Sequence, residues 1–232
     1  MKKPEFDYQI RKSARRKTIS ITVHPDNRIV VSAPASCSKK NILLFVEKKS
    51  DWIHGAIQAN LQRARQNRQR RFETGEKLLF LGREYILRVD RGSPPDVFLT
   101  GGFICVRLAS EGAPEPLEVK NHLLEWYVAR ALDKVKEKLP HYADWIGVNP
   151  HFVTIKSLKS RWGSCSVHGR ISLAWNIIMA PEAVLDYLVV HELCHMVHHN
   201  HSAHYWDLVA SILPDHRQSR KWLRENGGLL QL

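Results

Sequence analysis

The stretch VLDYLVVHELCH, residues 184–195, joins a strongly apolar helical pattern to two histidines and a glutamate. At 3.6 residues per turn, His191 and His195 lie one turn apart on the same helix face, so their imidazoles can converge on one ion. Glu192 lies about 100° round the helix, within reach of a water bound to that ion. Leu188 shares the stripe of the two histidines, which indicates that this face points inward. The spacing predicts a metal site on a buried helix.

A catalytic zinc site usually has three protein ligands and one open position, so a third ligand is expected nearby. Asn200 favours a left-handed helix end, and Ser202 can cap a helix that begins at Ala203. A turn between them would bring His201 back towards the metal, and His201 is therefore the predicted third ligand. His204 would lie one turn into the next helix, beside the substrate cleft.

Two further histidines, His198 and His199, follow the motif directly. His198 shares the helix face of the motif, but at 1.5 Å rise per residue its Cα would lie about 7 to 8 Å along the axis from the ligand pair. Histidines are also favoured at a helix end by the dipole. Both are interpreted as surface residues.

This arrangement of side chains matches the chemistry of a metal-dependent hydrolase. A zinc ion held by neutral imidazoles lowers the pKa of its bound water to about 7, and Glu192 can take the proton as general base. The leading hypothesis is a peptidase with one Zn²⁺ ion. Two alternatives stay open: a metal-dependent phosphohydrolase acting on a nucleoside triphosphate such as UTP, and a nucleic-acid-associated protein with a non-catalytic metal site.

Composition restricts where such an enzyme works. The chain has 232 residues, 44% of them hydrophobic, which is typical of a globular protein. Its apolar runs are far shorter than the roughly 20 residues needed to cross a bilayer, and no export signal is visible. Four widely spaced cysteines suit a reducing compartment. A soluble, cytoplasmic protein that does not bind membranes is expected.

The charge of the chain bears on its partners. A formal net charge of +12 attracts polyanions, so a nucleic acid or a nucleotide is a candidate partner beside the peptide or protein substrate. The most basic stretch contains Arg63, Arg65, Arg68, Arg70 and Arg71 with few apolar neighbours. It is read either as a solvated helix end or linker, or as a nucleic-acid contact.

The first part of the chain is predicted to be a β-rich module, residues 1–112, that contains one long basic helix. Alternating β-branched residues around Asp26-Asn27 predict a β-hairpin over 18–32. Ser36 or Ser38 can cap a helix over 39–70. Four further strands are expected over 77–80, 84–89, 97–99 and 103–108.

The second part, residues 113–232, is predicted to be the catalytic domain. Apolar residues at helical spacing predict a helix over 116–139 that ends at Pro140. Strands are expected over 152–158 and 170–175, and Pro181-Glu182 should open the metal-binding helix. The fold class is therefore α+β, with a β-rich N-terminal module followed by an α/β domain that carries the predicted metal site.

Several motifs together resemble one known family. They are Arg161-Trp162-Gly163-Ser164-Cys165-Ser166, Leu173-Ala174-Trp175-Asn176, the HELCH motif, Asn200-His201-Ser202 and Tyr205-Trp206, with looser similarity at residues 13–18 and 81–85. The chain resembles the YgjP-like zinc metallopeptidases, which are zincins with an HExxH motif related to SprT-like and WLM proteases.

The resemblance implies a minimal zincin core with His191, His195 and His201 as zinc ligands and Glu192 as catalytic acid/base. The chain has Tyr205 where the family often has phenylalanine. Two readings of the Arg161-Trp162 loop stay open: it lines the substrate cleft, where Arg161 would bind an anion, or it is a tight turn that packs in the core. The candidate cleft residues are Arg161, Trp162, His204 and Tyr205.

Overall fold

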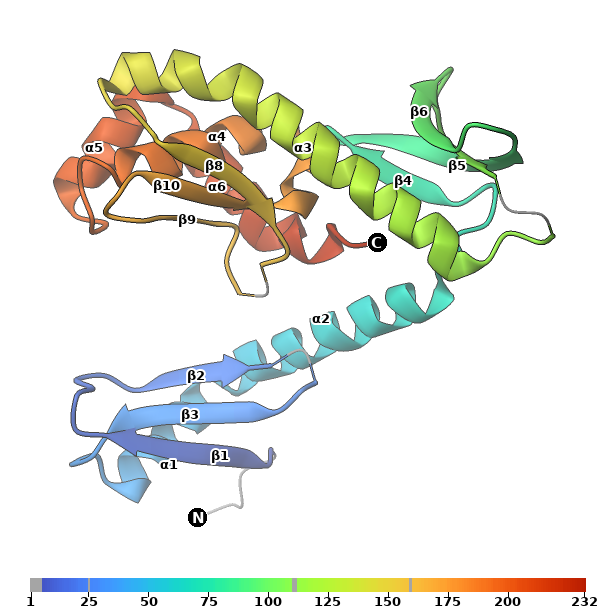
Figure 1. Ribbon diagram of the computed structural model, residues 1–232. Helices are drawn as coiled ribbons and strands as arrows, with labels where there is room; N and C mark the ends of the chain where they lie inside the picture. The colour runs from blue at the N-terminus through green and yellow to red at the C-terminus, as the bar shows by residue number, and fades with distance from the viewer. Residues whose placement is uncertain (1–5, 25, 110–111, 159) are drawn as a thin grey trace. The chain divides into compact units, whose positions relative to one another are not determined.

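The computed structural model describes residues 6–24, 26–109, 112–158 and 160–232, and only the backbone of 62–69 (Figure 1). Its helices and small mixed sheets give an α+β fold, as predicted. The chain forms two compact units, Met1–Gln69 and Arg70–Leu232. Within the described residues, no helix is both long enough and apolar enough to cross a membrane.

The first unit contains a three-stranded sheet with the order β1-β3-β2. The predicted hairpin is confirmed as β2 (Ser20–Val23) and β3 (Ile29–Pro34), which pair antiparallel. The strand β1 (Tyr8–Ser13) was not predicted; it pairs parallel to β3. Alternate residues of β3 pack on the helices that follow, and the resulting small core consists of Ile29, Val31, Ala33, Ile42, Val46 and Ile53.

Two helices, α1 (Lys39–Lys48) and α2 (Ser50–Gln69), replace the predicted single helix. Ser38 caps α1 by accepting a hydrogen bond from the amide of Asn41. Lys49 leaves helical geometry, and its amide bonds only three residues back to Val46, which closes α1 with a tight turn. No glycine or proline marks this break. The side chains of Arg63, Arg65 and Arg68 lie outside the described residues.

The second unit begins with a four-stranded sheet of order β4-β5-β7-β6. Its strands confirm the sequence prediction: β4 (Lys77–Phe80), β5 (Arg83–Arg91), β6 (Asp96–Thr100) and β7 (Phe103–Leu108). The long helix α3 (Pro116–Ile146) contacts β6 and β7 and shares their core. The hydroxyl of Tyr127 on α3 donates to the carbonyl of Leu79 on β4 at 2.8 Å.

Pro140 does not end α3, contrary to the prediction. The helix continues to Ile146, and Gly147 ends it in the left-handed conformation with φ 79°. A proline inside a helix costs one backbone hydrogen bond and introduces a steric clash. Val135 and Ala143, which flank Pro140 along α3, are both buried, so packing offsets this cost.

The β4–β5 turn joins this sheet to the region of the HELCH motif. The amides of Leu81 and Gly82 donate to the carbonyls of Ile178 and Met179 at 2.8 and 3.1 Å. Gly82 has φ 75°, and a Cβ there would lie 2.8 Å from the Cα of Pro181. The compact units divide near residue 70, whereas the predicted domain boundary lies after residue 112. The reason is that residues 77–108 share a core with the helices that follow.

The last part of the second unit contains a three-stranded sheet, three α-helices and two short 3₁₀ helices. The sheet has the order β8-β10-β9, with β8 (Phe152–Lys156), β10 (Arg170–Ala174) and the short β9 (Gly163–Cys165), which was not predicted. The 3₁₀ helix η1 (Trp175–Met179) leads into α4 (Glu182–Cys194), as the proline at 181 predicted. Then come α5 (Ala203–Ile212), α6 (His216–Asn226) and η2 (Gly227–Leu229).

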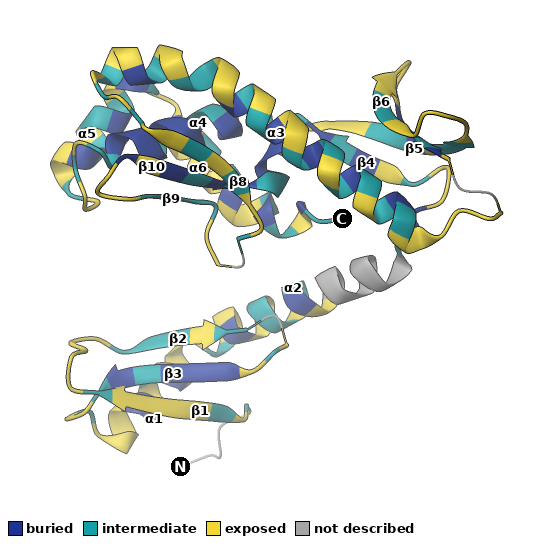
Figure 2. Ribbon diagram, viewed as in Figure 1, coloured by how far each residue is buried: buried dark blue, intermediate teal, exposed yellow. Residues whose placement is uncertain are grey.

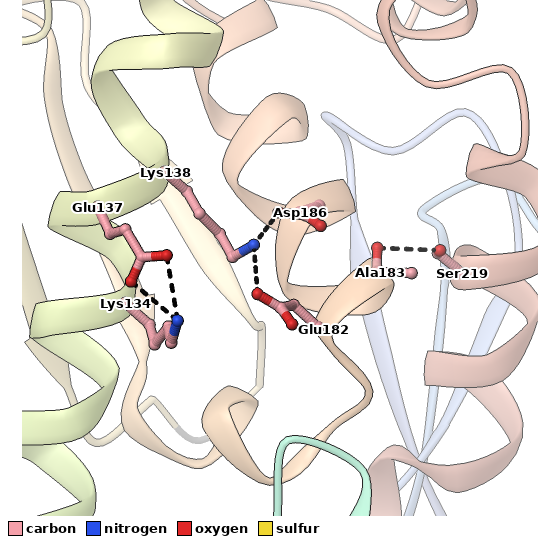
Figure 3. A network of polar contacts seen from close by, with 7 residues as sticks. All are labelled: Lys134, Glu137, Lys138, Glu182, Ala183, Asp186 and Ser219. Carbon is pink, nitrogen blue, oxygen red and sulfur yellow. Dashed lines mark hydrogen bonds and ion pairs between the residues drawn. The ribbon is translucent and has the colours of Figure 1, made fainter.

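Helix α4 carries the HELCH motif through the centre of this unit. Nine of its 13 residues are buried (Figure 2). Polar contacts hold its first turns from two sides (Figure 3). Lys138 of α3 lies 2.7 Å from the carboxylate of Glu182 and 2.9 Å from that of Asp186. The hydroxyl of Ser219 on α6 donates to the carbonyl of Ala183 at 3.2 Å.

Candidate active site

Three histidines meet where α4 ends and α5 begins. His191 and His195 come from α4 and its C-cap, and His201 comes from the loop before α5. One ring nitrogen from each lies within 4.8 Å of the others. The Nε2 atoms of His191 and His201 are 3.3 Å apart. The structure therefore brings together the three residues that the sequence predicted as metal ligands.

The loop between His195 and His201 differs in detail from the prediction. Helix α4 ends at Cys194, and turn bonds from Val197 and His198 to the Cys194 carbonyl close it. Asn200 is not in the left-handed conformation, so the predicted helix end there is wrong. Instead its side-chain oxygen accepts from the amide of Ser202 at 3.1 Å, which forms a compact polar turn.

A backbone carbonyl orients the His195 ring. The Nδ1 atom of His195 lies 3.1 Å from the carbonyl oxygen of His198. A carbonyl can only accept, so Nδ1 carries the proton and Nε2 keeps its lone pair for a metal. His198 therefore supports the site through its main-chain carbonyl, and its imidazole is not a metal ligand in the predicted set.

Burial keeps the His191 ring neutral. Burial, and then the positive charges of His195, His201 and Arg220, lower the pKa of His191 to about 3. Its Nδ1 atom lies 3.4 Å from the hydroxyl of Tyr187, one turn earlier on α4. Burial also lowers the pKa of His195, which the hydrogen bond to the His198 carbonyl partly opposes. Neutral imidazoles are the form that binds metal.

Two aromatic residues of α5 hold the ligand rings in place. Ser202 caps α5 as predicted, by accepting from the amide of Tyr205. The Tyr205 ring is fully buried and stacks on His195 at 4.7 Å, and its hydroxyl donates to the His191 carbonyl at 3.0 Å. Trp206 stacks on His201 at 5.5 Å with 21° between the ring planes. Tyr205 is thus a buried support of the ligands and not a cleft residue.

Glu192 is a buried carboxylate next to the histidine cluster. Glu192 is only 3% exposed, and its Oε2 atom has no hydrogen-bond partner among the described residues. Burial raises the pKa of Glu192 to about 7, an effect that the positive charge of Arg161 partly opposes. Such a carboxylate is well suited to exchange protons near neutral pH.

The position of Glu192 depends on a glycine that the sequence analysis did not assign to the site. A Cβ added to Gly163 of β9 would lie 2.8 Å from Cδ and 2.9 Å from Cγ of Glu192, closer than Cβ atoms normally approach. The backbone of Gly163 therefore packs directly against the Glu192 carboxylate, with no room for a side chain at residue 163. This contact between β9 and α4 joins residues 29 positions apart, so no local pattern could reveal it.

A cleft of about 720 Å³ opens over these groups. It is lined by all three histidines, by Glu192, and by the predicted cleft residues Arg161 and Trp162. Two arginines of α6, Arg220 and Arg224, also line it and were not predicted. His204 does not belong to the described lining; it is exposed, and its ring lies 6.4 Å from that of His198.

The donor set fits a transition metal. Three imidazoles can present ring nitrogens to one point, and imidazole suits Zn, Cu, Fe and Ni, whereas Mg and Ca prefer oxygen donors. A buried carboxylate without a partner stands beside them. Together these residues form the site of a metal-dependent hydrolase.

Comparison with known proteins identifies the class more closely. The family model described as YgjP-like, metallopeptidase domain, matches residues 17–226. The chain belongs to this family and is a metal-dependent peptidase. Among solved structures, it is similar to the crystal structure of the metallopeptidase zymogen abylysin of Pyrococcus abyssi, with 24% identity, a TM-score of 0.36, and coverage of 39% of this chain and 93% of that chain. A search of curated proteins finds no match.

Proposed function

We propose that the chain is a zinc-dependent peptidase in which His191, His195 and His201 hold one zinc ion. The observation that carries this proposal is the convergence of their ring nitrogens within 4.8 Å of one another. Zinc is favoured among the metals that imidazole binds because three histidines and one open position are a common catalytic zinc set. A bound zinc ion would acidify a water molecule and polarise the carbonyl of the scissile peptide bond.

Glu192 is the proposed general base and acid. A carboxylate oxygen of Glu192 would take a proton from the attacking water and return it to the amine nitrogen that leaves. Gly163 keeps this carboxylate in place from one side. The hydrogen bond of Tyr205 to the His191 carbonyl and the stacking of Trp206 on His201 would fix the ligand rings while the proton moves.

The substrate is proposed to be a peptide or protein, cleaved in the cytoplasm. Support for a reducing compartment comes from the four cysteines of the chain, all of which are free thiols. Two of them, Cys105 and Cys194, are buried. Three imidazoles and a lone carboxylate do not suit a magnesium phosphohydrolase, which would need several oxygen ligands.

The test compares Glu192→Gln with wild type in the hydrolysis of an unfolded protein after loading with zinc. The substitution keeps the shape of the side chain but removes the proton acceptor, so kcat should fall by about 10²- to 10⁴-fold. Glu125→Gln, an exposed carboxylate on α3, is the matched control and should leave kcat unchanged. Wild-type hydrolysis of UTP without any cleavage of the protein would contradict the proposed function.

A further inference from the structure

Arginine dominates the charge of the cleft. Among the described lining residues, those of the Asp, Glu, Lys or Arg type are Arg161 before β9, Glu192 of α4, and Arg220 and Arg224 of α6. Glu192 is buried and assigned to proton transfer, so the groups that face a bound substrate are the three arginines. This excess of positive charge favours peptides that carry negative charge over neutral ones.

Arg220 is held beside the metal ligands without an acidic partner. Its guanidinium carbon lies 4.7 Å from the ring centre of Trp206, the residue that stacks on His201. Within the described part of the chain, neither Arg161 nor Arg220 forms an ion pair. Arg224 lies 3.5 Å from Glu225, but both of these side chains are largely exposed. Contact with the indole face orients the Arg220 guanidinium and lowers the entropy lost when it binds a ligand.

The positive surface continues outside the cleft. Arg217 and Lys221 join Arg220 and Arg224 around a second hollow of about 470 Å³ beside Trp206 and His216. All four cations lie on α6, and each is exposed. A surface lined by one sign of charge concentrates ligands of the opposite sign. An acidic peptide would therefore meet positive charge before it reaches the cleft and again inside it.

We propose that Arg220, assisted by Arg224 and Arg161, forms a carboxylate-binding subsite that makes this peptidase prefer substrates with an acidic group close to the scissile bond. The planar guanidinium fork matches a carboxylate with two parallel hydrogen bonds. The carboxylate comes from an Asp or Glu side chain or from a free C-terminus. This inference rests on the proposed peptidase function, which supplies the substrate whose preference Arg220 sets.

The first measurement is binding, because it does not require turnover. Four peptides are titrated by calorimetry into zinc-loaded Glu192→Gln protein. One sequence contains glutamate and its counterpart contains glutamine, and each is made with a free and with an amidated C-terminus. The glutamate peptides should bind about 10- to 100-fold more tightly than the glutamine peptides if the side chain is the ligand, as expected for a hydrogen bond to a charged group. If the C-terminus is the ligand, amidation should cause this loss instead.

The second measurement assigns the preference to Arg220. Adding Arg220→Gln should abolish the difference between the charged and uncharged peptides, whereas Arg220→Lys should retain part of it. Arg217→Gln is the matched control, because it removes one cation from the same helix outside the cleft lining, and it should reduce the preference far less than Arg220→Gln does.

Three results would overturn the subsite: equal binding of all four peptides, a preference that survives Arg220→Gln, or an equal loss with Arg217→Gln. Tighter Arg220-dependent binding of UTP than of the acidic peptide would also overturn it, because the ligand would then be a phosphate. Failure of the proposed function is distinct, since wild type would bind the acidic peptide and never cleave it.

Discussion

Helices α4 and α6 bound the same cleft but are constructed in opposite ways. Nine of the 13 residues of α4 are buried, whereas only His216 and Leu223 of the 11 residues of α6 are. Close packing fixes the positions of the α4 side chains, so this helix can hold a metal site and a proton carrier with little freedom. The cations of α6 are exposed, so close packing does not fix them, although contact with the Trp206 ring orients Arg220. In the proposed account, the buried helix carries the chemistry and the exposed helix attracts the substrate.

If close packing on α4 fixes the catalytic group, the largest effect on kcat should come from Gly163→Ala. The added methyl group would displace the Glu192 carboxylate, while the metal ligands stay in place. Because a misplacement of about 1 Å can cost about 10²-fold in rate, kcat should fall by roughly that factor. Peptide hydrolysis and zinc content are measured together. Unchanged kcat, or a parallel loss of zinc, would contradict the idea that Gly163 positions Glu192.

A control for Gly163→Ala is Gly55→Ala in α2. A Cβ at residue 55 meets no atom within 4 Å, so the same chemical change occurs in open space. Alanine is a better helix former than glycine, by about 1 kcal/mol. This variant should keep full activity and should not lose stability.

A smaller effect is expected from Lys138→Met, which tests how α4 is held. Lys138 is 14% exposed and Asp186 is 19% exposed, so removal of the ammonium group leaves a poorly solvated carboxylate on α4. The loss of unfolding free energy should be about 1 to 3 kcal/mol, measured by urea denaturation at neutral pH. Lys134→Met, which removes an exposed i,i+3 pair with Glu137 on α3, should cost less than about 0.5 kcal/mol.

The effect of Lys138→Met should depend on pH in a defined direction. Its hydrogen bond and then its charge lower the pKa of Glu182 below the ordinary 4.5, so this contribution exists above 4.5 and disappears as pH falls through the folded value. Burial disfavours the charged form of Lys138, but the hydrogen bonds that its ammonium group donates to Glu182 and Asp186 keep its pKa above the ordinary 10.5. That contribution is lost as pH rises through the folded value. A stability difference that does not shrink in acid would contradict this assignment.

Local patterns predicted the parts of the site that lie close together in the chain. The helical spacing of His191 and His195 and the cap at Ser202 follow from short-range geometry, and the three predicted ligands do converge. The strands over 77–108 were likewise separated by turn signals at Gly82, Gly92-Ser93-Pro94-Pro95 and Gly101-Gly102. Pro140 misled the prediction because a local preference was outweighed by packing on both sides of it.

The features that sequence could not reveal depend on contacts between distant segments. Gly163 meets Glu192 only because β9 packs against α4. Arg220 lies in α6, for which the sequence analysis made no prediction, and its place in the cleft follows from the packing of α6 on α4. Tyr205 was a candidate cleft residue because its hydroxyl could reach the site, but its ring is buried and packs on His195.

The most direct test of the central claim is the zinc content of the purified protein and of two histidine variants, measured by mass spectrometry after removal of loosely bound metal. Wild type should contain about one zinc ion per chain, the number expected for a catalytic three-histidine site. His201→Ala should lose most of this zinc. His198→Ala should retain it, because the His198 carbonyl that orients His195 belongs to the main chain. Full zinc content in His201→Ala together with loss in His198→Ala would contradict the account.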